Sequence, residues 1–542
     1  EPFKYGGAEA GECAGGEHAG SDVAEEGGEC VALVFGGVDH ESFILQHVEQ
    51  VVEAGAGQFE VAGDGRGAYG SAVAGEVPDD AQRAACGGYV AHGAPPGQPQ
   101  TQCLGYQTVY AEMDARARGI AALMRVMTVH DVELGVGAPT HTDVIAVARH
   151  DARVTIAPDA MAAIEKSRAV IEALASDTQP HYGVSTGFGA LASKHIPPPR
   201  RAQLQRSLVR SHAASSGPEV EREVVRATMF LRLSTLATGH TGVRPVVAET
   251  YAAMLNAGIT PVVGEYGSLG CSGDLAPLAH CALAAMGEGS VRVSAPNSLS
   301  AEVFEAGPSG TLMQASDALT AADIEPVELH EKEGLALING TDGMLGMLVM
   351  AIHDIRKLVT TADLAAALSV EGLQGTDAVF AADLHALRPH PGQRDSAANM
   401  RAVLTGSPML SQPEGFTRVQ DAYSLRCAPQ VHGAVRDTVE HAATVAGREL
   451  ASAIDNPVVT VDGRLESNGN FHGAPLGYVL DFLAIAVADL ASMSERRTDR
   501  FLDVARSHGL NAFLADDPGV DSGHMIAQYT QAAIVSELKR LA

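Results

Sequence analysis

The chain has 542 residues, of which 46% are hydrophobic, and it carries no tryptophan and a formal net charge of −29 at pH 7. A chain of this length buries a large core and has room for more than one domain. The strongly acidic balance argues against nucleic acids and anionic membranes as partners, because phosphate groups are bound by lysine and arginine.

The cysteine pattern and the apolar runs favour a cytoplasmic protein. None of the seven cysteines lies in a Cys-x-x-Cys pair, and the first residues form no apolar stretch typical of a signal peptide. No apolar run is expected to reach the length that spans a membrane, since the best candidate, Leu476–Leu490, is interrupted by Asp481 and Asp489. We therefore expect a buried helix there and a reduced protein of the cytoplasm.

Residues 1–126 differ in composition from the rest of the chain. They hold 23 of the 58 glycines and 19 acidic against 6 basic residues, and helical periodicity is absent until about Glu112. One hypothesis is that Met127 is the biological start and that residues 1–126 are upstream sequence. The alternative is a genuine acidic leader that is disordered because it cannot bury a core.

From Met127 onward the pattern is mainly helical. After a strand-like stretch at 153–156, a helix is expected to begin at Pro158 and to end near Ser176. A second helix is expected after Pro197–Pro199, with His212 on the same face as two leucines. Residues 342–370 carry a seam spaced for helix-on-helix packing, formed by Leu345, Leu348, Ile352, Ile355 and Val359.

Residues 475–505 and 525–541 have the same long, apolar character. Helices of this kind suit a bundle buried inside an oligomer. The sequence therefore predicts a mainly α fold, with short strands and loops in a domain at 127–340 and a long-helix bundle at 341–542.

The most informative segment is 267–280, Gly-Ser-Leu-Gly-Cys-Ser-Gly-Asp-Leu-Ala-Pro-Leu-Ala-His. The amide nitrogen of Gly273, which has no Cβ to obstruct it, can approach the carbonyl carbon of Cys271 closely. Dehydration of Ser272 would complete a methylidene-imidazolone (MIO), an electrophile made without an external cofactor. A bare Ser-Gly-Asp is more often a turn that caps a helix through Ser272 or Asp274, but the fourteen-residue context reverses that preference.

This segment resembles the signature of the aromatic amino acid ammonia-lyases, and among them most closely that of the histidine ammonia-lyases. The resemblance extends from about Met127 to Ala542. Six further motifs occur in the family's order: 181–189 (HYGVSTGFG), 211–214 (SHAA), 337–341 (LINGT), 419–426 (VQDAYSLR), 470–473 (NFHG) and 494–497 (SERR). The resemblance implies a long-helix bundle of the aromatic ammonia-lyase and fumarase-like type, assembled as a homotetramer.

The resemblance also implies site residues. Tyr182 would act as the base that removes the β-hydrogen, and Tyr423 would orient the amine or assist elimination. Because a phenol is a weak base near neutral pH, we expect several helix N-termini and backbone amides to converge near the triad and Tyr182. Arg426 would bind the substrate carboxylate.

Three further residues would line the substrate. Gln420 lies six residues before Arg426, so that both, with Tyr423 between them, could face one cavity. Asn339 would donate a hydrogen bond to the carboxylate or to the MIO oxygen, and Phe471 would form an apolar wall.

His212 bears on the choice of substrate. Histidine and tyrosine lyases of the family carry His there, whereas phenylalanine lyases carry an apolar residue. A buried imidazole binds a substrate imidazole or phenol and penalises a bare phenyl ring. The resemblance thus implies deamination of L-histidine to urocanate and ammonia. The alternatives are a tyrosine or phenylalanine ammonia-lyase or aminomutase, and a non-catalytic helical oligomer.

The remaining expectations concern the other histidines and the C-terminal end of the bundle. The other histidines, such as His240, His280, His432 and His472, show no metal-ligand spacing and are interpreted as structural. Members of the family continue with further helices after the position of Ala542, so the resemblance implies a bundle that is truncated at its C-terminal end.

Overall fold

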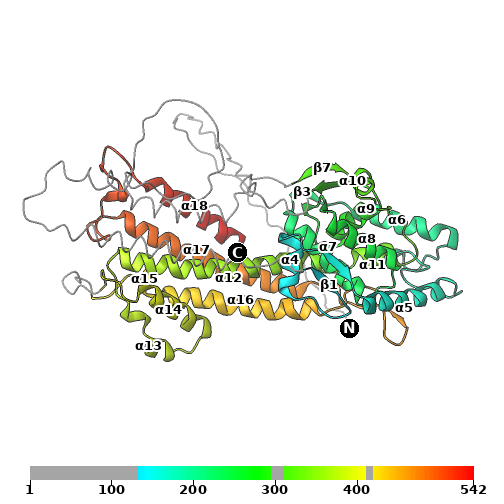
Figure 1. Ribbon diagram of the computed structural model, residues 1–542, viewed down its shortest axis with the longest axis horizontal. Coiled ribbons are helices and arrows are strands. Elements are labelled where there is room, and N and C mark those ends of the chain that lie inside the picture. Colours follow the sequence, from blue (N-terminus) through cyan, green and yellow to red (C-terminus); the bar gives the residue numbers. More distant parts are fainter. Residues whose placement is uncertain (1–130, 295–309, 411–418) are drawn as a thin grey trace, which may run out of the picture.

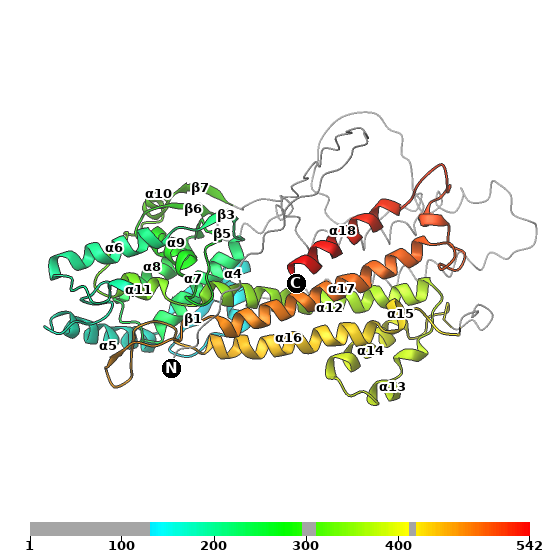
Figure 2. The ribbon, with the colours of Figure 1, turned by 180° about the vertical axis from the view of Figure 1, so that it is seen from behind.

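A computed structural model describes residues 131–294, 310–410 and 419–542 (Figure 1). These residues form a lobe at one end of a set of long helices, as the two opposite views show (Figure 1, Figure 2). Residues 1–126 and Met127 lie outside the described residues, so the expectations for them stay predictions. The division near residue 340 stays a prediction, whereas the mainly α fold is confirmed.

The lobe contains short strands in small sheets. The strands are β1 (Val132–Leu134), β2 (Val154–Ile156), β3 (Ser216–Glu219), β4 (Ile259–Pro261), β5 (Gly264–Tyr266), β6 (Ser290–Val293) and β7 (Thr311–Gln314). Strand β1 pairs in parallel with β2, β3 pairs antiparallel with β5, and β4, β6 and β7 form an antiparallel sheet. A hairpin of β8 (Val458–Val459) and β9 (Leu465–Glu466) lies further along the chain. The strand expected at 153–156 is confirmed as β2.

Helices make up most of the lobe. They are α4 (His141–Arg149), α5 (Pro158–Ala175), α6 (Arg201–His212), α7 (Arg222–Ala237), α8 (Pro245–Asn256), α9 (Leu275–Ala285), α10 (Ala315–Ala321) and α11 (Glu333–Ile338). Pro158 occupies the first turn of α5, where its missing N–H costs nothing. Helix α7 is the core element of the lobe, since every residue from Val224 to Ala237 is buried.

The long helices form the second part of the molecule. They are α12 (Asp342–Gly372), α13 (Ala382–Ala386), α14 (Pro391–Leu404), α15 (Tyr423–Arg426), α16 (Ala428–Leu450), α17 (Ala474–Leu502) and α18 (Met525–Leu541). Helix α12 packs against α7 in the lobe and against α14, α16 and α17 in the bundle. The five apolar residues of its predicted seam are all buried, each contributing about 1.5–3 kcal/mol. This prediction is confirmed.

Two helices are long and apolar enough to cross a membrane, so the expectation that no apolar run reaches this length is wrong. In the first, at 333–372, most of the most apolar 18-residue segment is buried inside the protein, as in the core helix of a globular protein. In the second, α17, only 28% of the corresponding 18-residue segment is buried within one chain. Tyr478, Phe482 and Ile485 follow one another on its exposed face, at 76%, 48% and 54% exposure. The buried helix expected at Leu476–Leu490 is therefore not buried by its own chain.

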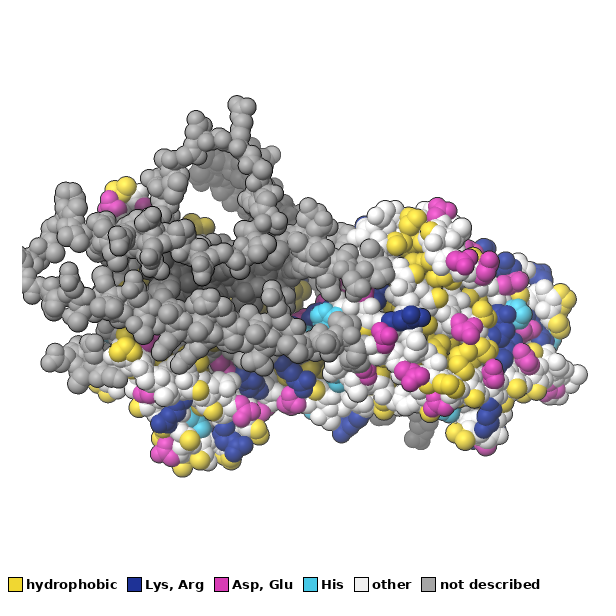
Figure 3. Space-filling model, in the orientation of Figure 1, with side chains coloured by type: hydrophobic (Ala, Val, Ile, Leu, Met, Phe, Trp, Pro, Cys, Tyr) yellow, Lys and Arg dark blue, Asp and Glu magenta, His cyan; other side chains and the backbone are white. Residues whose placement is uncertain are grey.

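Charged side chains of both signs and apolar side chains are interspersed over the visible face of the lobe (Figure 3). Among the described residues of this face, lysines and arginines do not gather into a continuous basic surface of the kind that binds nucleic acid.

Candidate active site

The Cys271-Ser272-Gly273 triad lies in the loop between β5 and α9. Gly273 adopts φ +81°, in the left-handed region, and a Cβ on it would lie 2.4 Å from the carbonyl oxygen of Gly340. The amide of Ser272 donates a 2.7 Å hydrogen bond to the carbonyl of Leu269, which makes the loop a tight turn. Only glycine fits the third position, as closure of an imidazolone ring requires.

Three helices begin at this loop. The amide of Asp274, at the start of α9, donates to Gly340 (2.7 Å), two residues before α12 begins. The amide of Gly473, at the start of α17, donates to the carbonyl of Gly270 (2.6 Å). Each helix N-terminus favours negative charge by about 0.3–2 kcal/mol. The expected convergence of helix N-termini is thus present at the triad, and the part of this expectation that concerns Tyr182 stays a prediction.

Asp274 links the loop to α12 through its side chain. Although it occupies the N-cap position of α9, its carboxylate makes no cap bond to that helix. It accepts hydrogen bonds from the hydroxyl of Ser268 (2.5 Å) and from the amide of Met344 (2.9 Å). Burial, with a smaller contribution from Asp342, raises the pKa of the Asp274 carboxyl to about 6. The sequence suggested only a cap, because the distant partner Met344 leaves no local signal.

Asn339 and Phe471 lie beside the triad. Asn339 follows α11 and is 6% exposed, and its side-chain amide donates to the carbonyl of Asn456 (2.8 Å). The carbonyl oxygen of Phe471 lies 3.2 Å from the position of a Cβ on Gly273. The fold therefore brings both residues to the triad from distant parts of the chain.

Tyr182 lies in the loop that follows α5 and is half-buried. Its ring meets that of Phe188 edge to face, with centroids 6.3 Å apart, and its hydroxyl accepts a 3.2 Å hydrogen bond from the amide of Gly189. The next residue, Gly183, lies against Leu335 of α11. The loop of Tyr182 thus packs against α11, the helix that directly precedes Asn339.

His212 is the last residue of α6 and is half-buried, not enclosed as expected. A carbonyl can only accept, so the 2.9 Å contact of its Nδ1 with the carbonyl of Leu208 makes Nδ1 a donor. In the neutral ring the lone pair is then on Nε2, which is able to accept a hydrogen bond from a donor on the substrate ring.

The other histidines are hydrogen-bonded within the protein, as expected for structural residues. The contacts are those of His240 with the carbonyl of Val459, His280 with the amide of Ser215, His432 with the carboxylate of Asp363, and His472 with the amide of Ala474. Among the residues in the described ranges, no three His, Cys, Asp or Glu side chains are grouped as a metal site. Cys271, Cys281 and Cys427, the cysteines in these ranges, are free.

The remaining predicted residues lie elsewhere, on and before α15. The guanidinium of Arg426 lies 4.5 Å from the centroid of the Tyr423 ring, and its Nε donates to the carbonyl of Asp421 (2.8 Å). Tyr423 is 71% exposed. Gln420 precedes the helix and is exposed, so the expected helical spacing holds only for Tyr423 and Arg426.

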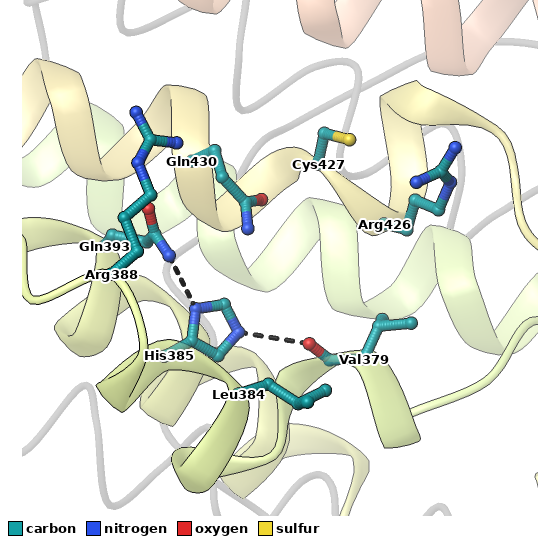
Figure 4. A pocket seen from close by; sticks show the side chains of 8 residues that line it. All are labelled: Val379, Leu384, His385, Arg388, Gln393, Arg426, Cys427 and Gln430. Atoms are coloured by element: carbon teal, nitrogen blue, oxygen red, sulfur yellow. Dashed lines mark hydrogen bonds between the residues drawn. The ribbon is translucent and has the colours of Figure 1, made fainter.

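Arg426 borders a cavity of about 260 Å³ between α13, α14 and the start of α16. Figure 4 shows His385 hydrogen-bonded to Gln393 and to the carbonyl of Val379, with Arg388 and Arg426 on the left and right of the view. Arg426 is the one predicted site residue in its lining.

The predicted site residues thus form two groups at opposite ends of α12. The triad lies at the N-terminal end, whereas Thr376, just beyond the C-terminal end, donates its amide to Asp421 beside Arg426. A helix of 31 residues is about 45 Å long. One chain therefore does not bring Tyr423 and Arg426 to its own triad.

The helical bundle, the Gly273 turn and the helix N-termini around it define a carbon–nitrogen lyase. The sequence profile described as aromatic amino acid lyase matches residues 140–542, and the chain belongs to this family. It is 65% identical over 414 residues to a histidine ammonia-lyase of Streptomyces griseus, covering 76% of this chain and 78% of that protein.

Solved structures agree on the fold. A histidine ammonia-lyase from Trypanosoma cruzi superposes with a TM-score of 0.65 at 37% identity, covering 76% of this chain and 74% of the other. A tyrosine aminomutase from Streptomyces globisporus gives a TM-score of 0.69, also at 37% identity, with coverage of 76% and 78%.

Proposed function

We propose that the protein removes ammonia from L-histidine without oxidation and releases urocanate, the first step of histidine degradation. The observation that carries this proposal is the turn at Cys271-Ser272-Gly273, where only glycine fits and three helices begin. The high identity to a histidine ammonia-lyase supports histidine over other substrates.

The triad is proposed to close into a methylidene-imidazolone, which supplies an electrophilic carbon for the amine of the substrate. Asp274 holds the loop against α12 while the ring closes. Tyr182 takes the β-proton on its phenolate oxygen and so becomes the neutral phenol, and the helix N-termini at the triad stabilise the negative charge that develops nearby. Asn339 donates a hydrogen bond to the substrate or to the ring oxygen, and Phe471 excludes water.

A second copy of the chain supplies Tyr423, Arg426 and Gln420, because these residues and the triad of their own chain lie at opposite ends of α12, a helix about 45 Å long. The backbone bond to Nε fixes the Arg426 guanidinium so that its terminal nitrogens can bind a carboxylate. The exposed apolar face of α17 at Tyr478, Phe482 and Ile485 is the surface that other copies would cover. We propose a homotetramer of this kind, located in the cytoplasm, where the free cysteines stay reduced.

Mixing two inactive variants tests the shared site. Ser272→Ala and Arg426→Met are each expected to be inactive as pure assemblies. Co-expressed in equal amounts, they are expected to regain about a quarter of wild-type activity, because random assembly joins an intact triad to an intact arginine in about one site in four. If the mass of the assemblies shows that they are mixed but less than a few per cent of the wild-type activity returns, Ser272 and Arg426 must act within the site of the same chain.

Substitution of His212 is expected to change the choice of substrate. In His212→Leu, kcat/KM for L-histidine falls by about 10- to 100-fold, because the ring N–H of the substrate loses its acceptor. The same change raises the activity on L-phenylalanine relative to L-histidine. Steady-state rates on both amino acids measure the ratio, and an unchanged ratio would remove His212 from the substrate ring.

A substrate panel tests the proposed function itself. Purified protein is incubated with L-histidine, L-tyrosine and L-phenylalanine, and the absorbance of the unsaturated acid is followed. Urocanate is the expected product. Coumarate would favour the tyrosine alternative, to which the similarity with a tyrosine aminomutase points. No product from a folded oligomer would favour a non-catalytic protein.

A further inference from the structure

A buried ion pair joins the residue before α11 to a residue after α16, in the part of the molecule that carries several proposed site residues. The ammonium of Lys332 lies 2.5 Å from the carboxylate Oδ2 of Asp455, and neither side chain is exposed to solvent. Burial lowers the pKa of the Lys332 ammonium and raises that of the Asp455 carboxyl, so each charge depends on the other for compensation.

The backbone at Lys332 is unusual. Lys332 precedes α11 with φ +73°, in the left-handed region that a residue with a Cβ rarely adopts. Such conformations persist only where the surroundings enforce them, and they cluster at functional sites.

One side of the pair contacts the loop of Tyr182. A Cβ on Gly183 would lie 3.5 Å from Cδ of Lys332 and 3.4 Å from Cδ of Pro457, two residues after Asp455. The carbonyl of Gly183 accepts a hydrogen bond from Gln205 (3.3 Å), whose side-chain oxygen accepts the amide of Leu335 in α11. Gly183, the residue after Tyr182, thus packs against the Lys332 side chain and against Pro457, two residues after Asp455.

The other side of the pair leads to Asn339 and Phe471. The second carboxylate oxygen of Asp455 accepts the amide of Asn456 (2.7 Å), and the carbonyl of Asn456 accepts the side-chain amide of Asn339. The side chain of Asn468 donates to the carbonyl of Asp455 (3.0 Å) and accepts the amide of Asn470 (2.9 Å), the residue before Phe471.

The segments that carry three proposed site residues therefore meet at one ion pair. We propose that the Lys332–Asp455 pair is a positioning device, which holds Tyr182, Asn339 and Phe471 in one arrangement around the triad. It touches no substrate, and its role rests on the proposed function. The triad loop itself is held by Asp274 and α12, so the pair is not required for ring closure.

The test compares the full-length assembled protein with Lys332→Met, Asp455→Asn, the double variant and Asp455→Glu. Each single neutral variant leaves one buried charge without its partner and is expected to unfold at a lower temperature. The double variant contains neither charge and is expected to regain most of that loss, whereas Asp455→Glu keeps both charges but displaces the contact. In every variant that assembles, kcat for L-histidine is expected to fall at least about 30-fold and KM to change less than about threefold. KM changes little because Arg426, which is proposed to bind the substrate carboxylate, lies at the other end of α12 and does not contact the pair.

Two measurements separate positioning from general stability. The peptide that contains Ser272 should be lighter by two waters in the variants, as in the wild type. Arg226→Met serves as the matched control, since Arg226 is a buried cation of α7 that pairs with Asp151 and contacts none of the three segments described above. This variant is expected to lose stability and to keep kcat within about twofold.

Recovery of kcat together with thermal stability in the double variant would overturn the proposal. So would an equal loss in Arg226→Met, or peptides that lack the loss of two waters. If the wild type itself fails to produce urocanate, the proposed function is wrong. If the wild type is active and the Lys332 and Asp455 variants match it, only the positioning role is wrong.

Discussion

Replacement of Ser272 by alanine is expected to lower the turnover of L-histidine at least about a thousandfold, equivalent to about 4 kcal/mol of transition-state stabilisation. The serine hydroxyl is the group that leaves as water when the ring forms, and alanine has none to lose. An amine is a poor leaving group, so the remaining residues would have to expel it without an electrophile. The rate of urocanate formation and the mass of the peptide containing residue 272 measure the two effects together.

Folding and assembly should be unchanged in Ser272→Ala, because Ser272 is only partly buried and the turn depends on its backbone amide. Ser290→Ala, an exposed serine in β6, is the matched control and should keep full activity. In Cys271→Ala the peptide should still be lighter by two waters, since ring closure uses only the carbonyl of that residue. Turnover of Ser272→Ala within tenfold of the wild type would exclude the proposed electrophile.

The sequence predicted the long helices because local patterns determine them. The seam of α12 repeats every three or four residues, and prolines mark the first turns of α5 and α17. The burial of α17 was predicted less well, since its hydrophobic pattern is the same whether its own chain or another copy covers it.

The sequence also singled out Gly273 as a position that needs glycine, and the structure shows a close approach of Gly273 to Gly340. Closure of the triad into a ring stays a prediction. It did not reveal the role of Asp274 or of the Lys332–Asp455 pair. Both depend on partners more than 60 residues away, and neither leaves a periodic signal. Nor could motif order show that Arg426 lies at the far end of α12, since that follows from the length and direction of a helix packed in three dimensions.

Replacement of Tyr182 by phenylalanine is the second change with a large expected effect. Removal of a general base typically costs about 10²- to 10⁴-fold in rate, so kcat for L-histidine is expected to fall within that range. Phenylalanine keeps the edge-to-face contact with Phe188, and only the hydroxyl that accepts the amide of Gly189 is lost. The loss of that hydrogen bond should lower stability by about 1 kcal/mol.

The mass of the Ser272 peptide distinguishes this variant from Ser272→Ala, because ring closure does not need the Tyr182 hydroxyl and two waters should still be lost. Tyr251→Phe is a matched control: Tyr251 is fully buried in α8, and its hydroxyl has no hydrogen-bond partner among the described residues. Removing an unpaired buried hydroxyl should leave kcat unchanged and should not lower stability. If Tyr182→Phe retains more than a tenth of the wild-type kcat while its ring is closed, the proton must go to another group. The exposed Tyr423, which we propose reaches the triad from a second copy, would then be the next residue to replace, and a mixture with Ser272→Ala would show from which chain it acts.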